Sequence, residues 1–254
     1  MPIIQSYDPV RVYTLDGAPA CRRLLLLCQR VPALHPRHCR GNFGVCLSNP
    51  ATLRTAVLYG SVREKRQGIK AARFVVRHLE ARGHNVTLVD AAAHGLPLLD
   101  RMYKEYGAGE APVAMRQVAE ILDAADGFVI VSGEYNHSIP PALKNLLDHY
   151  QREYLYKPSG IVTYSGGPFG GVRGLVNLRG ILAELGTPSI PSAFPISRVQ
   201  HAFDDEGNAL EAAYDERIGK FLDEFEWYAV ALKRARECER YSDEAPVQQV
   251  MCRS

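Results

Sequence analysis

The sequence predicts an α/β protein built on a doubly wound parallel sheet of five strands. Short β-prone segments alternate with amphipathic segments, and each strand–helix unit is about 25–35 residues long. The segment at residues 127–131 is almost continuously apolar, as expected for a strand that is buried on both faces of a parallel sheet. Because parallel crossovers are right-handed, the helices must cover both faces of the sheet. At 254 residues, the chain is long enough for one such domain and an appendage.

The predicted elements follow in regular order. The strands cover residues 55–59, 85–89, 127–131, 161–164 and 189–193. The helices cover residues 69–82, 113–125, 140–150, 172–185 and 210–235. The first helix has apolar residues at the i, i+3, i+4, i+7 spacing, and Gly83 follows it as a C-terminal cap. Pro140 and Pro141 open the third helix, where a missing N–H is harmless.

The first fifty residues differ in composition from the rest of the chain. They hold six arginines and two aspartates, with no lysine or glutamate. Their net charge is therefore +4, whereas the net charge of the whole chain is +2. The remaining 204 residues are therefore close to neutral, which gives no reason to expect a nucleic-acid partner. The longest apolar run, residues 24–28, is far shorter than the ~18–20 residues that cross a bilayer. We expect a cytoplasmic protein, with organellar targeting by the Arg-rich segment as the alternative.

These differences predict three parts: an irregular Arg/Cys-rich extension at 1–52, the α/β domain at 53–240 and a C-terminal tail at 241–254. Four of the six cysteines lie in the extension, at positions 21, 28, 39 and 46. Their C-x6-C-x10-C-x6-C spacing lacks the close cysteine pair that is typical of zinc sites. We therefore expect no metal site and no disulfide framework.

In a sheet of this kind ligands bind beyond the carboxyl ends of the strands. The first such loop, residues 60–68, leads directly into a helix, so its backbone N–H groups and the helix dipole favour an anion. Ser61 adds a hydroxyl group and Arg63 a guanidinium group. The loop lacks the glycine and lysine pattern of a Walker or dinucleotide loop, and a plain turn with surface basic residues is the alternative.

Two further loops follow the third and fourth strands. In the segment from residue 132 to 141, the Tyr135 ring and the Asn136 amide suit a planar heteroaromatic ligand. The alternative is a helix cap at Ser138 with a packed tyrosine. In the segment at 164–174, four glycines fall within six residues. Because glycines are costly in chain entropy, this loop is best explained by backbone N–H groups presented to a ring system.

Three motifs in this order resemble the NAD(P)H-dependent FMN reductases of the flavodoxin-like superfamily, which include small quinone and azo reductases. They are GSVREKRQG at 60–68, EYNHSIPPALKNLLD at 134–148 and YSGGPFGGVRG at 164–174. The resemblance covers about residues 54–200 and implies the strand order 2-1-3-4-5. It also implies the following FMN-binding residues: Ser61, Arg63, Gln67 and Gly68 at the phosphate, Gly133, Glu134, Tyr135 and Asn136 along the ring and ribityl chain, and Ser165, Gly166, Gly167 and Gly170 at the pyrimidine edge. This chain has Gly133 where the family usually has proline.

The resemblance implies hydride transfer from NADPH or NADH through FMN to a quinone, an azo compound or free flavin. Such chemistry needs no catalytic side chain, although His137 could donate a proton to an acceptor. Arg173 and Arg179 are candidates for contacting the nucleotide or a neighbouring subunit. The resemblance also implies a homodimer or homotetramer, and the helix from 140 to 150, with Tyr150, Tyr154 and Tyr156, is the expected interface. An arsenical or metal-ion reductase, an electron carrier and a flavin-binding sensor remain alternatives.

Overall fold

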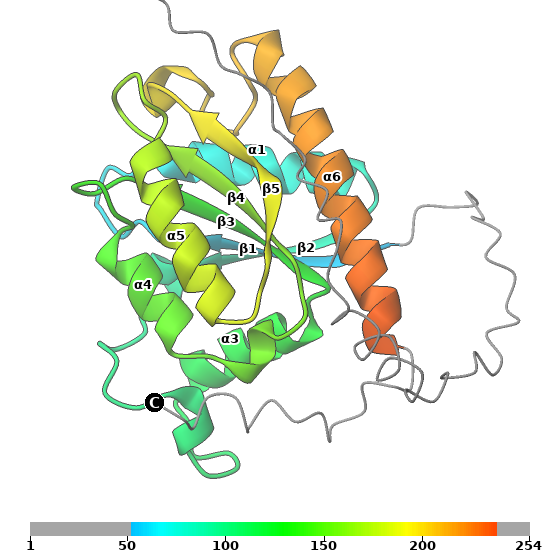
Figure 1. The fold of residues 1–254 in the computed structure, drawn as a ribbon. Helices are drawn as coiled ribbons and strands as arrows, with labels where there is room; N and C mark the ends of the chain where they lie inside the picture. Colours follow the sequence, from blue (N-terminus) through cyan, green and yellow to red (C-terminus); the bar gives the residue numbers. More distant parts are fainter. Residues whose placement is uncertain (1–51, 238–254) are drawn as a thin grey trace, which may run out of the picture. The chain divides into compact units, whose positions relative to one another are not determined.

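Five parallel strands form one sheet in the computed structural model, which describes residues 52–237 (Figure 1). They are β1 (Arg54–Tyr59), β2 (Asn85–Asp90), β3 (Gly127–Gly133), β4 (Ser159–Tyr164) and β5 (Ser189–Ile196). The strand order is β2-β1-β3-β4-β5, and each neighbouring pair is parallel. The predicted fold class and strand order are confirmed. The expectations for the Arg/Cys-rich segment and the C-terminal tail concern positions outside the described residues.

Helices cover both faces of the sheet, as predicted. On one face lie α1 (Gly68–Ala81) and α6 (Ala212–Glu237), and on the other lie α3 (Val113–Ala124), α4 (Pro141–Asp148) and α5 (Val172–Glu184). The short elements are α2 (Ala91–His94), η3 (Tyr103–Glu105), η4 (Arg152–Tyr154) and η5 (Val199–His201). None of the helices within residues 52–237 is both long and apolar enough to cross a bilayer.

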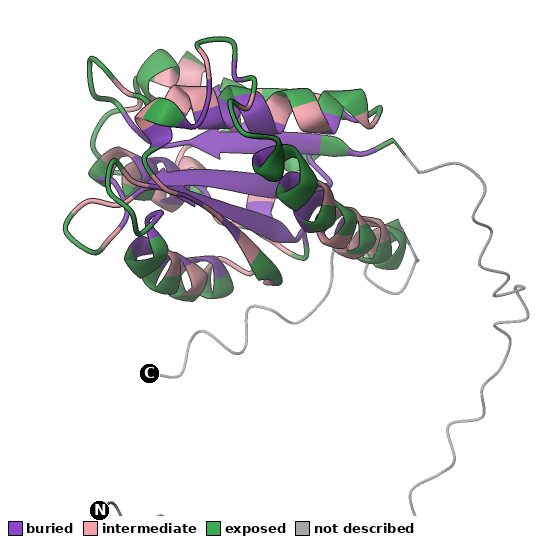
Figure 2. Cartoon of the chain, turned by 90° about the horizontal axis from the view of Figure 1, so that it is seen from above, coloured by how far each residue is buried: buried purple, intermediate pink, exposed green. Residues whose placement is uncertain are grey.

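The central strand β3 explains why the sheet needs two apolar layers. All seven of its residues are buried, and its apolar side chains alternate between the two cores. Val129 and Val131 pack on the α1/α6 side, whereas Phe128 and Ile130 pack on the α3/α4/α5 side. Figure 2 shows the buried strands between helices whose outer surfaces are exposed. The continuous apolar run in the sequence is thus a strand that is covered on both faces.

Several predicted boundaries are corrected by the structure. β3 extends through Ser132 and Gly133, which were expected in the loop. β5 continues to Ile196, because an edge strand tolerates its two prolines. α6 begins at Ala212 rather than at residue 210. The one-turn helix α2, which Asp90 caps by accepting from the Ala92 N–H, had no signal in the apolar pattern.

The expected role of two tyrosines is wrong. Tyr150 and Tyr154 are 1% and 0% exposed, and they belong to the core between the sheet and helices α3, α4 and α5. The Tyr150 hydroxyl donates to the Met115 carbonyl of α3 at 3.0 Å. These rings are therefore used within the chain and add no area to an oligomer interface. Only Tyr156 among the three is exposed.

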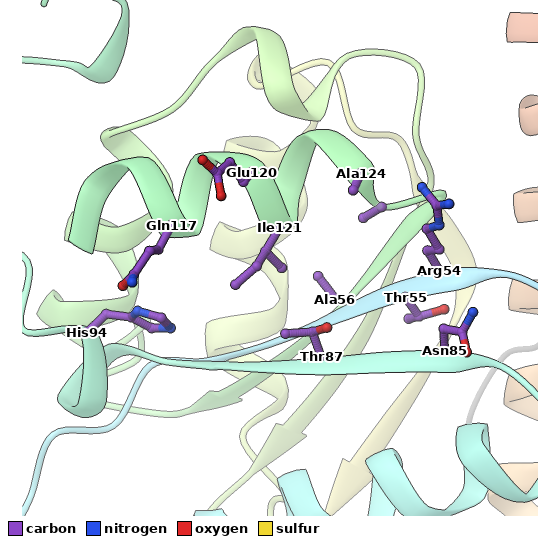
Figure 3. Close-up of a pocket in the computed structure, with 11 residues that line it drawn as sticks. Arg54, Thr55, Ala56, Asn85, Thr87, His94, Gln117, Glu120, Ile121 and Ala124 are labelled. Carbon is purple, nitrogen blue, oxygen red and sulfur yellow. The ribbon is translucent and has the colours of Figure 1, made fainter. Parts of the chain in front are cut away.

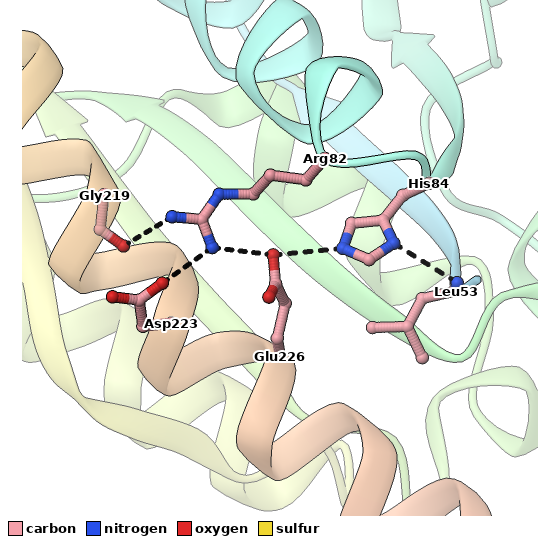
Figure 4. Close-up of polar contacts among 6 residues, drawn as sticks. All are labelled: Leu53, Arg82, His84, Gly219, Asp223 and Glu226. Atoms are coloured by element: carbon pink, nitrogen blue, oxygen red, sulfur yellow. Dashed lines mark hydrogen bonds and ion pairs between the residues drawn. The ribbon is translucent and has the colours of Figure 1, made fainter. Parts of the chain in front are cut away.

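Long-range polar contacts hold α1 and α6 together at the amino edge of the sheet (Figure 4). Arg82, at the end of α1, reaches Asp223 at 2.8 Å and Glu226 at 2.9 Å on α6. The same Glu226 oxygen lies 3.0 Å from His84 Nε2. His84 Nδ1 accepts from the Leu53 N–H, so the hydrogen of the neutral ring must sit on Nε2 and point at Glu226.

Candidate functional site

The loop between β1 and α1 is held by an arginine that the sequence analysis did not single out. Arg66 donates to both carboxylate oxygens of Asp90 at 2.5 Å and to the Ser61 carbonyl at 3.0 Å. It also lies over the Tyr59 ring, 5.3 Å from the centroid. The hydrogen bond to Asp90 raises the pKa of Arg66 above its ordinary value. Arg66 therefore anchors the loop to the end of β2.

The rest of this loop leaves hydrogen-bond donors free. Within residues 52–237, the N–H groups of residues 61–65 have no hydrogen-bond partner. The Arg63 side chain is exposed and has no ion pair among the described residues, and Gln67 forms no side-chain cap on α1. At Gly60, an added Cβ would lie 2.2 Å from Leu143 Cβ, so only glycine lets α4 approach. The loop is thus a rigid turn with unpaired N–H groups at a helix amino terminus, a typical anion site.

The loop after β3 is a tight turn. Tyr135 and Ser138 exchange backbone hydrogen bonds at 2.9 and 3.0 Å, and the two residues between them, Asn136 and His137, have positive φ angles of 49° and 66°. Such angles at both central positions are typical of a type I′ turn. The Tyr135 hydroxyl lies 3.4 Å from Ser61 Oγ, which brings the first two loops together. His137 is exposed at the tip of the turn.

Glu134 joins this turn to α5. Its carboxylate accepts from the backbone N–H of Arg173 at 3.1 Å and from the Arg173 guanidinium at 3.3 Å. The guanidinium also lies over the Phe169 ring, 4.5 Å from the centroid. Arg173, which the sequence left open to a nucleotide or a neighbouring subunit, is therefore engaged within the chain. Arg179 is likewise engaged, with the β5 groups Ser189, Ile190 and Pro191.

The glycine-rich loop after β4 presents bare backbone. The carbonyl of Gly167 accepts from Ser165 Oγ and from the Arg198 N–H, both at 3.0 Å. The N–H groups of Gly166 and Gly167 have no partner among the described residues. A Cβ on Gly167 would meet nothing within 4 Å, so the space beside it is open. Gly170 differs, because it packs against Pro195 of β5 with a φ of +62°.

A cluster of hydroxyl groups lies where the three loops meet, and the sequence analysis missed two of them. The Tyr164 ring lies between Gly68 and Gly133, since a Cβ on those glycines would be 2.0 Å and 3.1 Å from Tyr164 Cζ. The Tyr59 and Tyr164 rings are 6.4 Å apart. The Tyr59 hydroxyl is fully buried without a hydrogen-bond partner among the described residues. The order of strands could have indicated this cluster, because β1, β3 and β4 are neighbours.

This arrangement fits a phosphate joined to a flat ring. The first loop offers unpaired N–H groups, a hydroxyl and a free cation, which suit a phosphate. Tyr135, whose hydroxyl lies beside Ser61, supplies an aromatic ring, and Gly166 and Gly167 supply open backbone that suits a flat ring. FMN carries both kinds of group, so the residues present fit it.

A groove of about 490 Å³ lies elsewhere (Figure 3). It is bordered by β1, β2 and α3, and Arg54, Asn85 and Ala125 place one end of it at the amino edge of the sheet. None of the predicted site residues lines it. The groove and the three loops are therefore separate features of the chain.

Comparison with known proteins decides the family. Residues 53–201 match the family model described as NADPH-dependent FMN reductase. The chain belongs to this family. As a member it is an oxidoreductase that uses FMN as cofactor and NAD(P)H as co-substrate. The matched region contains all three loops of the candidate site.

Individual relatives support the assignment. The chain is 33% identical over 190 residues to a probable NADPH:quinone oxidoreductase of rice, covering 72% of this chain and 94% of the relative. It is 32% identical over 145 residues to an NAD(P)H-dependent FMN reductase of Pseudomonas aeruginosa, covering 55% and 76%. The solved structure of the flavoenzyme FerB from Paracoccus denitrificans, an NAD(P)H:(acceptor) oxidoreductase, matches with a TM-score of 0.59 at 20% identity, covering 71% of this chain and 98% of FerB. At that identity the structural match supports the fold alone.

Proposed function

We propose that this chain transfers hydride from NADPH, or from NADH, through bound FMN to a quinone, an azo compound or free flavin. The observation that carries the proposal is the convergence of three loops at the carboxyl edge of the sheet, the first and third of which have unpaired N–H groups among the described residues. FMN, when bound by these loops, would supply the hydride-transfer chemistry. With a quinone, NADPH and one proton give NADP⁺ and the hydroquinone.

The first loop would hold the phosphate. The N–H groups of residues 61–65 and the amino terminus of α1, from Gln67 and Gly68, point positive dipoles at it. Ser61 contributes its hydroxyl, and Arg63, which has no ion pair among the described residues, contributes charge. Arg66 keeps the loop in place through Asp90 and does not need to touch the ligand.

The other two loops would orient the ring. Gly133, Glu134, Tyr135 and Asn136 would line the ribityl and ring side, with Glu134 acting mainly by holding Arg173. Ser165, Gly166 and Gly167 would border the pyrimidine edge, where the free N–H groups of the two glycines would stabilise negative charge on the flavin. Gly170 allows the tight turn against β5. No side chain needs to act as acid or base, and His137, exposed at the turn, is positioned to meet an acceptor.

The acceptor class rests on the relatives. Curated relatives are named as NADPH:quinone oxidoreductases in rice and Arabidopsis thaliana and as an NADPH azoreductase in a Bacillus strain. We propose that the nicotinamide and the acceptor use the same open ring face in turn, because the described residues contain no separate dinucleotide-binding loop. A homodimer or homotetramer and a cytoplasmic location complete the proposal.

The decisive experiment is the visible spectrum of the purified full-length protein, followed by stopped-flow mixing with NADPH. A reductase shows bound flavin that bleaches rapidly and recovers its colour when menadione or an azo dye is added. Slow bleaching would favour a carrier or sensor, and recovery only with an arsenical or a metal ion would favour that reductase. A protein that binds no FMN would overturn the proposal.

The phosphate site has its own test. Replacing Ser61 and Arg63 together by alanine should weaken FMN binding by roughly a hundredfold, because a charge-assisted contact and a hydroxyl donor are lost. Lys220→Ala, at an exposed position on α6, is the matched control for the loss of a positive charge. Equal affinities for both variants would place the phosphate elsewhere.

A further inference from the structure

Tyr164 occupies an unusual place for a residue at the end of a strand. It is the last residue of β4, yet its ring reaches past Gly133 of β3 to the first residue of α1. A Cβ on Gly68 would lie 2.0 Å from Tyr164 Cζ and 2.4 Å from its hydroxyl oxygen. A Cβ on Gly133 would lie 3.1 Å from the same hydroxyl. The two glycines therefore leave room for the phenol, whose hydroxyl lies at the amino terminus of a 14-residue helix.

The hydroxyl is nearly buried and has no hydrogen bond of good geometry among the described residues. Tyr164 is 8% exposed, and the hydroxyls of Tyr59 and Ser61 lie close enough to act on its pKa as hydrogen-bond partners. The adjacent Tyr59 hydroxyl is fully buried and has no hydrogen-bond partner of good geometry among the described residues. A polar group of this kind, beside a helix amino terminus, indicates a ligand.

The titration behaviour agrees with a donor. Burial is the main cause of a raised pKa at Tyr164, and the neighbouring Tyr59 raises it further. The hydroxyl therefore keeps its proton throughout the physiological range and can donate to an anion. A bound phosphate would satisfy this donor together with Ser61, whose side chain lies beside it and is 3% exposed.

We propose that the Tyr164 hydroxyl donates a hydrogen bond to the FMN phosphate and is a specificity residue for the phosphorylated flavin. This inference rests on the proposed function, because it requires FMN in the three-loop site. Gly68 and Gly133 then have a role in binding, because their lack of a Cβ admits the phenol. Riboflavin, which has the same ring and ribityl chain without the phosphate, does not use this contact.

The test compares two flavins and two phenylalanine variants of the full chain. Tyr164→Phe keeps the ring that packs on Gly68 and removes only the hydroxyl. Titration of the apoprotein by flavin fluorescence should show a roughly tenfold or larger weakening for FMN, as expected for a hydrogen bond to a charged group, and riboflavin affinity within twofold of wild type. Tyr59→Phe, which removes the enclosed hydroxyl of the adjacent ring, should leave both affinities within twofold.

The outcomes are separable. An unchanged ratio of FMN to riboflavin affinity in Tyr164→Phe would overturn the inference, whether both flavins weaken together or neither does. Weakening of FMN binding by Tyr59→Phe to the same extent would also overturn it, because the effect would then not be specific to the Tyr164 hydroxyl. If wild-type protein binds neither flavin, the proposed function itself fails. Thermal unfolding of the apo variants establishes that each is folded.

Discussion

The two edges of the sheet differ in whether their polar groups are paired within the chain. At the amino edge, polar and charged groups are paired over long sequence distances, as in the contacts of Arg82 and His84 with α6 (Figure 4). At the carboxyl edge, the N–H groups of residues 61–65, Gly166 and Gly167 have no partner among the described residues. The difference teaches that stability and binding are divided between the edges, since unpaired donors cost stability unless a ligand satisfies them.

Asp126 is the residue at the amino edge whose substitution should lower stability most. Its carboxylate accepts from the Arg54 N–H at 2.9 Å and from Lys233 at 3.0 Å, and it lies 3.6 Å from Arg236, while the residue is 8% exposed. Asp126→Ala should lower the free energy of unfolding by about 3 kcal/mol, because nearly buried partners lose their acceptor. Urea unfolding of the apoprotein measures this loss.

The same variant should leave FMN affinity within twofold of wild type, because Asp126 lies at the opposite edge from the three loops. Asp205→Ala is the control, since Asp205 pairs with Lys70 in a highly exposed position and should cost less than about 0.5 kcal/mol. A large drop in FMN affinity for Asp126→Ala would show that the two edges are not independent.

Gly68 offers the corresponding change at the carboxyl edge. Gly68→Ala forces a Cβ against the Tyr164 ring and should lower the free energy of unfolding by about 2 kcal/mol, as overpacking does. FMN binding should weaken more than tenfold in fluorescence titration, because the helix terminus and the phenol are displaced together. Gly167→Ala, where an added Cβ meets nothing within 4 Å, should change stability by less than about 0.5 kcal/mol.

A second variant tests whether the Tyr164 ring is what clashes with the Cβ added at position 68. In a Tyr164→Leu chain, Gly68→Ala should cost clearly less stability than in wild type, because the ring that blocks the Cβ is gone. The same cost in both backgrounds would mean that the helix terminus, and not the phenol, requires glycine.

The sequence was sufficient for the layers of this fold and insufficient for its long-range polar pairs. Apolar periodicity is local, so β3 and the stripe of α1 could be predicted from neighbouring residues. The pair of Arg66 and Asp90 spans 24 positions and depends on register, with Asp90 lying beside Tyr59 at the ends of β2 and β1. The predicted strand order 2-1-3-4-5 places the ends of β1 and β2 side by side, so it could have indicated that pair.

The site was predicted through its residue types and missed where side chains cross strands. Glycines, Ser61 and Tyr135 follow strands directly, so their loops could be found in the sequence. Tyr164 reaches from β4 across β3 to α1, a contact that no local pattern encodes. The misplaced Tyr150 and Tyr154 have the same cause, since the segment around η4 folds back onto α3 and uses their rings in the core.

Lys157 makes the stability of the amino edge depend on pH. Its ammonium group donates to the Leu122 and Asp123 carbonyls at 2.8 and 2.7 Å at the end of α3. Burial lowers the pKa of Lys157 from 10.5 to about 8. Between these values the unfolded chain binds more protons than the folded chain, so stability rises with pH.

We expect wild type to gain about 1.5 kcal/mol between pH 8 and pH 10 relative to Lys157→Met, about half of the full shift because the group is partly solvated. Urea unfolding at several pH values measures the difference. Above this window the raised pKa values of the buried Tyr150 and Tyr154 act in the opposite direction. A constant difference between wild type and the variant would show that Lys157 is not the group that titrates.

Substitutions at Arg66 have the smallest expected effect. They separate two properties of the first loop, its anchoring to Asp90 and its positive charge. Arg66→Met removes the anchor to Asp90 and one positive charge from the first loop, whereas Lys65→Met removes only the charge of an exposed side chain. We expect FMN affinity to fall about fivefold for Arg66→Met, or about 1 kcal/mol, and less than twofold for Lys65→Met. For Asp90→Asn we expect FMN affinity to fall about threefold, although the loop becomes more positive, because a neutral amide holds the Arg66 guanidinium less tightly. Tighter FMN binding by Asp90→Asn would mean that the charge of the loop, and not its anchoring, determines affinity at this edge.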